Sequence, residues 1–323
     1  MVELDARLAD IRNTVKGMLP EGVREAVKYA RLRNRMRKQM AMRPEEYPEA
    51  IKQHYEQIKG KPLDLDNPQT FSEKIQWMKA YHSTPEYGRL ADKYLVRSFV
   101  ADRIGEKFLT KLYGVWDDAD DIDFDALPDR FALKATHGCG WNIIVRDKSE
   151  LDEREARRKL RRWLKLNYAF IHDFELHYQY CEPRIIAEEY LANDMGEDSD
   201  GELSDIKFFC FDGKVHYIAY YEGRYAHETR SSFFDPDWNE QDFQLLYSPI
   251  KHDVARPENL DEMIRLAECL AEGFPHVRVD FYRLDDGRVV FGELTFTTGS
   301  GVGKWETPQA DVALGEPFVL PLR

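Results

Sequence analysis

Cysteine is scarce in this sequence, and no two cysteines lie close enough to form a metal-binding or redox pair. The 323 residues contain only four: Cys139, Cys181, Cys210 and Cys269. A CxxC pair is the usual sequence signal for a zinc or redox site, so neither class is favoured. We expect each cysteine to fill space as a small buried residue in a reducing cytoplasm.

Long apolar runs and an excess of positive charge are also missing. No stretch approaches the roughly 18 consecutive apolar residues that a membrane span needs, and the first residues lack the apolar core of a signal peptide. The chain has 46 Lys+Arg against 59 Asp+Glu, a formal net charge of −13, whereas a general nucleic-acid binder presents a basic face. We therefore expect a cytoplasmic protein that does not bind nucleic acid.

The patterns that are present predict an α+β protein. Hydrophobic residues make up 43% of the chain, and its length exceeds the roughly 250 residues of a single core. Apolar spacing predicts helices over 1–58, 71–78, 90–104 and 261–272, and another that begins near 149–152. Strands are expected at 108–113, 130–134, 143–145 and 184–191. Asp212-Gly213 and Asp286-Gly287 predict two hairpins, 205–211 with 214–221 and 277–283 with 288–295.

The N-terminal helical region carries a basic run between Arg24 and Arg43. One interpretation is a solvated helix face docked on an acidic body. The other is an amphipathic stretch on an anionic membrane surface or a polyanionic partner. The spacing of the basic residues does not decide between the two.

A small-residue loop follows the expected strand that ends at Lys134. It reads Lys134-Ala-Thr-His137-Gly138-Cys139-Gly140. Glycine lets a backbone approach a phosphate and point N–H groups at it, and lysine adds a compact charge. The loop is neither a Walker A loop nor a GxGxxG fingerprint, and taken alone such a loop is more often just a hairpin turn.

Two carboxylates lie on the strands of the second hairpin. Asp280 follows Val279, and Glu293 precedes Leu294, so both interrupt apolar strands. Burying such groups without a partner is costly. Magnesium bound with phosphate oxygens would resolve that cost, and so would a salt bridge to an arginine. Lys207, among aromatic residues, likewise needs a charged partner or a phosphate.

In their order along the chain these features resemble the ATP-grasp superfamily. The closer resemblance is to the TupA-like (teichuronopeptide biosynthesis) amidoligases, through three phrases, 67–77, 134–138 and 293–296. It implies an ATP-grasp fold of two α+β subdomains that grip ATP, preceded by a helical N-terminal region. The implied division is a helical extension (1–62), a pre-grasp region (63–130), subdomain 1 with the Gly-rich loop (131–191) and subdomain 2 with the Mg/phosphate site (192–323).

The resemblance also implies roles for individual residues. ATP would be held by Lys93, Lys134, His137, Gly138, Cys139, Gly140, Glu188, Glu189, Tyr190, Leu191 and Lys207. Mg²⁺ would be held by Asp280, Glu293 and Thr295, and Arg278 would act with Lys134 and Lys207 on the transferring phosphate. Thr295 departs from the pattern, because many relatives carry Asn there, which puts the strength of the metal site in doubt.

The acceptor site is expected around Arg224, His227, Arg230 and Arg278, with the small-residue loop Gly299, Ser300 and Gly301. For Arg224, His227 and Arg230 taken singly, an ordinary charged residue of a surface loop is an equal alternative.

The implied reaction joins a carboxylate to an amine through an acyl phosphate. The family name suggests that the carboxylate belongs to a uronic acid of a surface polysaccharide and that the amine belongs to an amino acid. The alternatives are a kinase with the same ATP site, a glycosyltransferase, although no convincing DxD site is found, and a nucleotide sensor. The basic helix fits contact with the inner face of the membrane.

Overall fold

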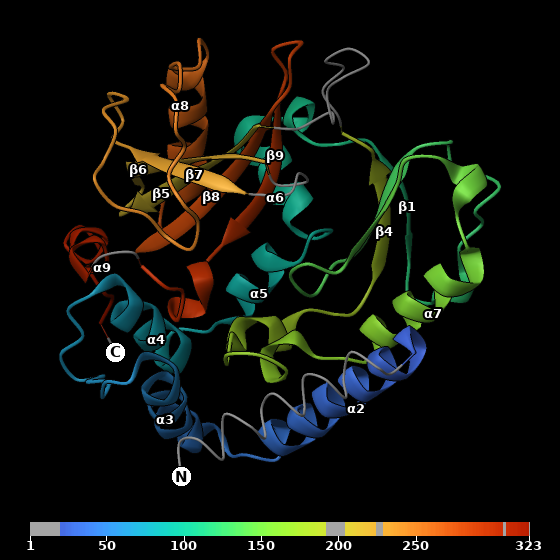
Figure 1. Cartoon of the computed structure of the whole chain (residues 1–323), viewed down its shortest axis with the longest axis horizontal. Coiled ribbons are helices and arrows are strands. Elements are labelled where there is room, and N and C mark those ends of the chain that lie inside the picture. The colour runs from blue at the N-terminus through green and yellow to red at the C-terminus, as the bar shows by residue number, and fades with distance from the viewer. Residues whose placement is uncertain (1–19, 192–203, 224–228, 306–307, 323) are drawn as a thin grey trace.

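The computed structural model describes residues 20–191, 204–223, 229–305 and 308–322 (Figure 1). The first half is mostly helical. Its helices are α2 (Glu21–Met40), α3 (Tyr47–Lys59), α4 (Phe71–Tyr81), α5 (Pro85–Ala91) and α6 (Val96–Ile104). Thr70 caps α4 in a reciprocal capping box with Glu73, which fixes where that helix begins.

A four-stranded antiparallel sheet follows. Its strands are β1 (Leu112–Trp116), β2 (Phe131–Ala135), β3 (Asn142–Val145) and β4 (Ile185–Glu189), in the spatial order β1-β4-β2-β3. Helix α7 (Glu153–Leu164) packs on β2 and closes a small apolar core around Leu133 and Leu160. Because β2 and β4 are antiparallel, the loop after β2 lies beside the start of β4, at the opposite end of the sheet from Glu189.

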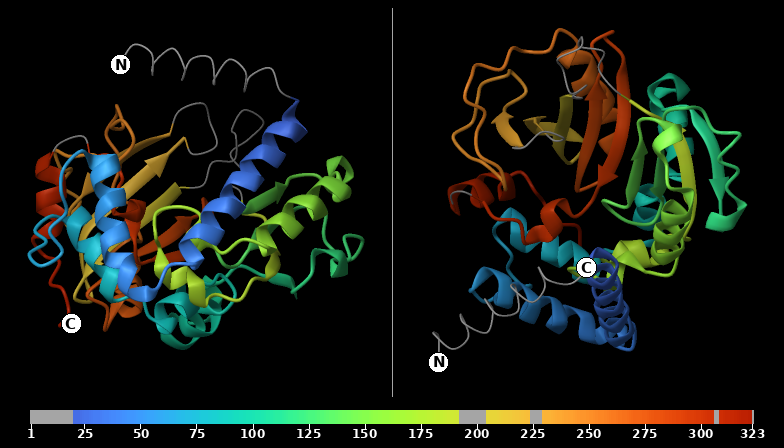
Figure 2. Two further views of the ribbon diagram at one scale, coloured as in Figure 1. Left: turned by 90° about the horizontal axis from the view of Figure 1, so that it is seen from below. Right: turned by 45° about the vertical axis from the view of Figure 1, so that its right-hand side comes forward.

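The second sheet has five antiparallel strands. They are β5 (Ser204–Phe211), β6 (Lys214–Glu222), β7 (Arg230–Phe234), β8 (His276–Arg283) and β9 (Val289–Thr295), in the order β7-β6-β5-β8-β9. The two sheets belong to different halves of the molecule (Figures 1 and 2). Mixed helices and antiparallel sheets confirm the expected α+β class, and helices α2 and α3 confirm a helical region before residue 70. The helix expected over residues 1–19 lies outside the described residues.

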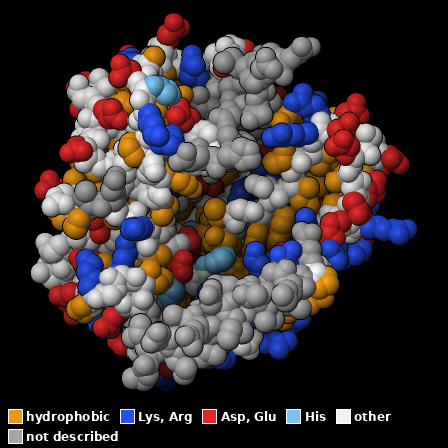
Figure 3. Space-filling model, in the orientation of Figure 1, with side chains coloured by type: hydrophobic (Ala, Val, Ile, Leu, Met, Phe, Trp, Pro, Cys, Tyr) orange, Lys and Arg blue, Asp and Glu red, His pale blue; other side chains and the backbone are white. Residues whose placement is uncertain are grey.

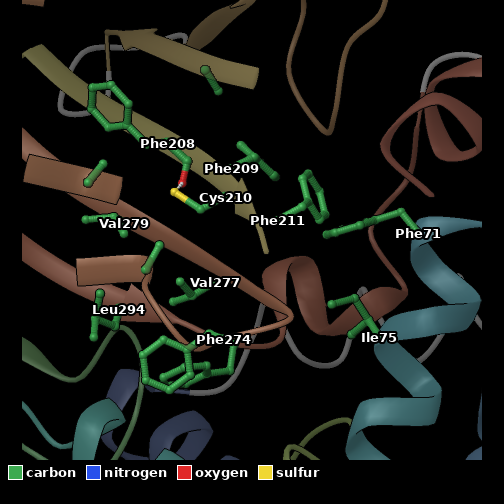
Figure 4. Close-up of a cluster of buried hydrophobic side chains, with 14 of the residues drawn as sticks. Phe71, Ile75, Phe208, Phe209, Cys210, Phe211, Phe274, Val277, Val279 and Leu294 are labelled. Atoms are coloured by element: carbon green, nitrogen blue, oxygen red, sulfur yellow. Dashed lines mark hydrogen bonds between the residues drawn. The ribbon is translucent and has the colours of Figure 1, made fainter. Parts of the chain in front are cut away.

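The two faces of the second sheet are covered differently. Helix α8 (Leu260–Ala271) packs along one face, over β5, β6 and β8. Part of the opposite face is covered by α4, whose Phe71 packs against Phe209 and Phe211 of β5 (Figure 4). Because α4 covers only that end, the remaining part of this face, around Lys207, is free to line a cavity. Helix α9 (Pro308–Gly315) packs beside α4.

Two expected elements differ from the observed ones. The helix expected over 90–104 breaks after α5, because the Asp92 carboxylate accepts hydrogen bonds from the backbone N–H groups of Tyr94 and Leu95, both at 2.9 Å. The strand expected at 108–113 begins only at Leu112, where pairing with β4 starts. A 3₁₀ turn, Glu106–Phe108, precedes it.

Candidate functional site

A cavity of about 460 Å³ lies between the two sheets. The face of the molecule in Figure 3 is hollowed between its two halves, and both apolar and basic side chains reach that hollow. The sequence predictions that line the cavity are Lys93, Lys134, Cys139, Gly140, Glu188, Glu189, Tyr190, Leu191, Lys207, Arg278, Asp280 and Glu293. Residues separated by up to 200 positions in the sequence therefore share one site.

Lys134 lies on the first sheet and forms an ion pair with Glu188 of β4. The Glu188 carboxylate is buried and also accepts a hydrogen bond from the Thr110 hydroxyl at 2.9 Å, with the Arg97 guanidinium 3.9 Å away. Burial acts to raise the pKa of Glu188, but Lys134 and Thr110 outweigh it, so the pKa is lowered. Lys134 and Glu188, which the sequence analysis assigned to ATP, thus lie together at the cavity, whereas the sequence did not reveal Thr110 and Arg97.

Arg278 is the centre of a charge network on the second sheet. Its guanidinium donates to both oxygens of Asp280, each at 2.6 Å, and to Glu293 Oε1 at 2.8 Å and Thr295 Oγ1 at 2.9 Å. Although burial works against its charge, Asp280 and Glu293 raise the pKa of Arg278. Thr295 therefore joins the network through hydrogen bonds to Arg278 and Glu293, although it does not line the cavity.

Lys207 adds a second cation to this network. Its ammonium lies 2.5 Å from Asp280 Oδ2 and 2.9 Å from Asp205 Oδ2. Asp280 is buried, which would raise its pKa, yet Arg278 and Lys207 lower that pKa overall. Asp205 is a network member that sequence reasoning missed, although the i, i+2 spacing Asp205-Ile-Lys207 on one strand was a usable signal.

A β-bulge brings the two carboxylates of β8 and β9 face to face. Asp280 pairs directly with Glu293, and the next registered pair is Phe281 with Phe291, so Gly292 is the extra residue. A Cβ atom at Gly292 would lie 3.1 Å from the Asp280 carbonyl oxygen and 3.3 Å from the Tyr282 ring. Bulges of this kind redirect side chains, and a larger residue at Gly292 would press on these two neighbours.

The residues present fit a magnesium ion. Three carboxylates, Asp205, Asp280 and Glu293, meet two cations, Arg278 and Lys207, so the network keeps one excess negative charge. Magnesium binds one or two protein carboxylates and completes its shell with water and phosphate oxygens. Among the residues described, no group of three His, Cys, Asp or Glu side chains could hold a metal ion by itself.

The loop after β2 is tied to neighbouring elements through its backbone and its aromatic residues. The Lys93 ammonium donates to the Gly138 carbonyl oxygen. His137 points away from the cavity: its buried ring has Nε2 3.1 Å from the Trp163 carbonyl oxygen of α7. Trp141, which the sequence analysis did not assign, lines the cavity and stacks on Trp163 with an interplanar angle of 5°. Gly138 does not line the cavity.

Of the predicted acceptor residues that the structure describes, only Arg278 lines the cavity. Ser300 Oγ donates to the buried carboxylate of Glu175 at 2.6 Å, and Gly299, Ser300 and Gly301 form a turn with positive φ outside the cavity lining. Arg230 donates to the Pro249 carbonyl oxygen at 3.0 Å. Arg224 and His227 lie outside the described residues.

The expectation for the cysteines is wrong for Cys139. Cys181 and Cys210 are buried as expected, and Cys269 is partly exposed, but Cys139 is exposed at the cavity. Cys139 belongs to the small-residue loop at the cavity, so it is exposed although cysteine is generally a buried residue.

Leu246 and Tyr247 also line the cavity. They come from the segment after β7, in which no motif marks them.

Comparison with known proteins gives one family match. A family model described as TupA-like ATPgrasp matches residues 73–319. No match is found among curated proteins.

Solved structures match this chain at low identity and with TM-scores below 0.5. D-alanine--D-alanine ligase from Bacillus anthracis is 18% identical with a TM-score of 0.39, and the match covers 65% of this chain and 57% of that protein. N5-carboxyaminoimidazole synthetase from Staphylococcus aureus, complexed with ADP, is 12% identical with a TM-score of 0.39, covering 64% and 44%. The ATP-grasp ligase PsnB is 13% identical with a TM-score of 0.35, covering 70% and 57%. The chain thus spans less than two thirds of the length of each.

Proposed function

The chain belongs to the TupA-like ATP-grasp family, and from this premise we propose that it is an ATP-dependent, Mg²⁺-requiring ligase that joins a carboxylate to an amine. The observation that carries the proposal is the network of Arg278, Lys207, Asp280 and Glu293 at one end of an otherwise partly apolar cavity. Such a site combines an apolar slot for a base with charged groups for phosphates.

The nucleotide would lie across the cavity from β4 to the charge network. Arg288, just before β9, lies 3.5 Å from Glu189, so the turn between β8 and β9 meets the end of β4. Backbone groups of Glu189–Leu191, with Ile144 and Phe291 as apolar walls, suit an adenine ring. The triphosphate would then run toward Arg278, which lies at the other end of β8.

The chain's own cations would neutralise the phosphates. Lys134 and Lys207 are point charges for phosphate oxygens, and the planar fork of Arg278 contacts two oxygens at once. Phosphoryl transfer needs positioning and charge stabilisation more than covalent help from the protein. Mg²⁺ held by Asp280 and Glu293 would supply further neutralisation of the phosphate oxygens.

The proposed reaction has two steps. A substrate carboxylate oxygen attacks the γ-phosphorus of ATP, the bond to the β,γ-bridging oxygen breaks, and ADP leaves with an acyl phosphate formed. An amine then attacks the acyl carbon, gives up a proton, and inorganic phosphate leaves as the amide forms. We propose a uronic acid, or its activated form, as the carboxylate partner and an amino acid as the amine, in surface-polysaccharide assembly.

Hydroxylamine trapping tests the ligase proposal. The protein is incubated with ATP, Mg²⁺ and hydroxylamine across uronic acids, sugar nucleotides and amino acids, and both ADP and hydroxamate are measured. We expect hydroxamate with one acid, and its loss in Lys134→Ala and in Glu293→Ala, each checked for folding by circular dichroism. ADP without hydroxamate, with phosphate appearing on a substrate hydroxyl, would instead establish a kinase.

We further propose that the protein works in the cytoplasm and contacts the inner face of the membrane through α2. No helix in the described part of the chain is long and apolar enough to cross a membrane. Leu32 and Met36 belong to the partly buried side of α2, whereas Val23 and Val27 on the opposite side are 44% and 40% exposed. Basic residues flank that exposed apolar strip, as in helices that lie on anionic lipid surfaces.

A further inference from the structure

Leu246 lies at the centre of a strained turn at the cavity. Its φ is 70°, and the Tyr247 backbone N–H donates to the Leu245 carbonyl oxygen at 2.9 Å. A bond between residues i and i+2 with positive φ at the centre closes a γ-turn of the rare, strained form. Strain of this kind persists only where the surroundings impose it, and it gathers at functional sites.

The surroundings of the turn do impose its conformation. On one side, the Leu246 backbone N–H donates to the Lys304 carbonyl oxygen at 3.0 Å. On the other, the Ser248 carbonyl oxygen accepts from the Ser231 backbone N–H of β7 at 3.1 Å. The turn is therefore clamped between β7 and the segment before α9, and it presents its side chains in a fixed place.

The two side chains that the turn presents are apolar and open to the cavity. Leu246 is 55% exposed and Tyr247 is 38% exposed, and both line the cavity. Holding a leucine in this conformation with its side chain in solvent adds nothing to the stability of the fold. The combination of strain and exposure is explained if a ligand covers the pair.

The turn adjoins the charged end of the cavity. The Tyr247 ring packs edge-to-face against Tyr221 at 5.8 Å. Lys207, which contacts Asp280, lies with its ammonium 5.2 Å from the centre of the Tyr221 ring. Leu246 and Tyr247 therefore lie on the β6–β7 side of the charge network. Lys134 and the end of β4 line the cavity from the first sheet.

We propose that Leu246 and Tyr247 form the platform for the carbon skeleton of the carboxylate substrate, and that this skeleton is a sugar-acid ring. The inference rests on the proposed ligase function with its uronic-acid substrate, and it adds the residues that would hold the ring of that acid. A pyranose ring has an apolar C–H face that packs on aromatic and aliphatic side chains, while its hydroxyl groups stay at the edge. With that face on the platform, the carboxylate would point toward Arg278 and Lys207.

Direct binding of glucuronate tests the platform without requiring turnover. Saturation-transfer NMR with ADP and Mg²⁺ present compares the wild-type protein with Leu246→Gly and Tyr247→Ala, while a fluorescent ATP analogue reports nucleotide affinity. Glycine accepts a positive φ freely, so Leu246→Gly removes the side chain without loss of folding. Tyr247→Trp keeps an aromatic face, and Tyr180→Ala, which truncates a 44% exposed tyrosine away from the cavity, is the matched control.

We expect glucuronate to bind at least about 10-fold more weakly to Leu246→Gly and Tyr247→Ala, with nucleotide affinity changed less than about twofold. Tyr247→Trp and Tyr180→Ala should bind glucuronate as the wild type does. Unchanged binding in both platform variants, or no binding of glucuronate to the wild type while glutamate binds, overturns the proposal. The ligase proposal fails separately: loss of glucuronate binding in the variants while no acid yields hydroxamate would retain the platform and reject the ligase.

Discussion

At the scale of single residues, the cations expected to hold phosphate are already paired with carboxylates. Lys134 is paired with Glu188, and Lys207 with Asp280 and Asp205. An ammonium has three donors, so Lys134 can also contact a phosphate oxygen while Glu188 fixes its position. The lysines and most of the carboxylates could be predicted from the sequence, because their motifs are local. Thr110 and Arg97 could not, because only the fold brings them to Glu188.

Replacing the buried Glu188 by Gln should remove the negative charge that pairs with Lys134. We expect the free energy of unfolding at pH 7 to fall by about 3 kcal/mol, measured by urea unfolding, since breaking a buried ion pair leaves an uncompensated charge. Glu189→Gln is the matched control. Glu189 is the next residue and pairs with the half-exposed Arg288, so we expect a loss below about 1 kcal/mol.

The pH dependence of the Glu188→Gln difference gives a further check. The folded-state pKa of Glu188 is lowered, so its stabilising contribution is fully present above the unfolded value, about 4.3, and is lost as the pH falls through the lower, folded value. The wild type and the variant should therefore converge in stability as the solution is acidified below pH 4. A difference that stays constant from pH 7 to pH 3 would contradict this account.

At the scale of elements, both Asp-Gly hairpins are confirmed, as β5–β6 and β8–β9. Their turns are determined by local backbone preferences, with Gly213 and Gly287 at positive φ. The bulge at Gly292 and the strained turn at Leu246 were not predictable, because each depends on packing against distant strands. The loop after β2 could be predicted in part. Its glycines can be read from the sequence, but its contact with α7 through Trp141 and Trp163 cannot.

The two glycines of that loop should respond differently to substitution by alanine. A Cβ atom at Gly138 would lie 2.7 Å from Tyr168 and 2.9 Å from the Trp141 ring, whereas one at Gly140 would meet nothing within 4 Å but sits at a φ of 71°. We expect Gly138→Ala to displace Trp141, alter the tryptophan fluorescence and weaken ADP binding by about 10-fold, or ~1.4 kcal/mol. Gly140→Ala should lower stability by about 1 kcal/mol and leave the fluorescence unchanged. Identical spectra for the wild type and Gly138→Ala would contradict this assignment.

At the scale of the whole molecule, the resemblance to the TupA-like ATP-grasp family is confirmed by the family match over residues 73–319. The domain boundaries stay a prediction. The N-terminal helices α3 and α4 share one continuous hydrophobic core with the second sheet, whereas the first sheet closes a separate core with α7. Strand β1, from the region expected to precede the grasp module, pairs with β4. A sequence shows where apolar patterns change, but not which layers share a core.

Helix α2 lies along the outside of the described part of the molecule (Figure 2), and its partly buried residues lie on one side of the helix. Met36 Sδ accepts from the Asn167 backbone N–H at 3.2 Å, and the Arg162 guanidinium packs over the Tyr29 ring at 5.6 Å. Deleting α2 would remove these contacts and expose the residues that it covers. Reversing charges on α2 is therefore the cleaner test of membrane contact. Arg24, Arg31 and Lys38 suit it, because their seven-residue spacing places them on one exposed flank of the helix.

Reversing Arg24, Arg31 and Lys38 to Glu should weaken binding to vesicles containing anionic lipid by about 100-fold, since each basic residue near such a surface contributes about 1 kcal/mol. Cosedimentation at low and physiological salt measures this, and the wild-type affinity itself should fall as salt is raised. The control reverses three exposed bases elsewhere, Lys107, Lys251 and Arg265, and so changes the net charge equally. Equal losses in both triple variants would show that overall charge, and not α2, governs binding. Hydroxamate formation in solution should be the same in all three proteins, because α2 contributes no residue to the cavity.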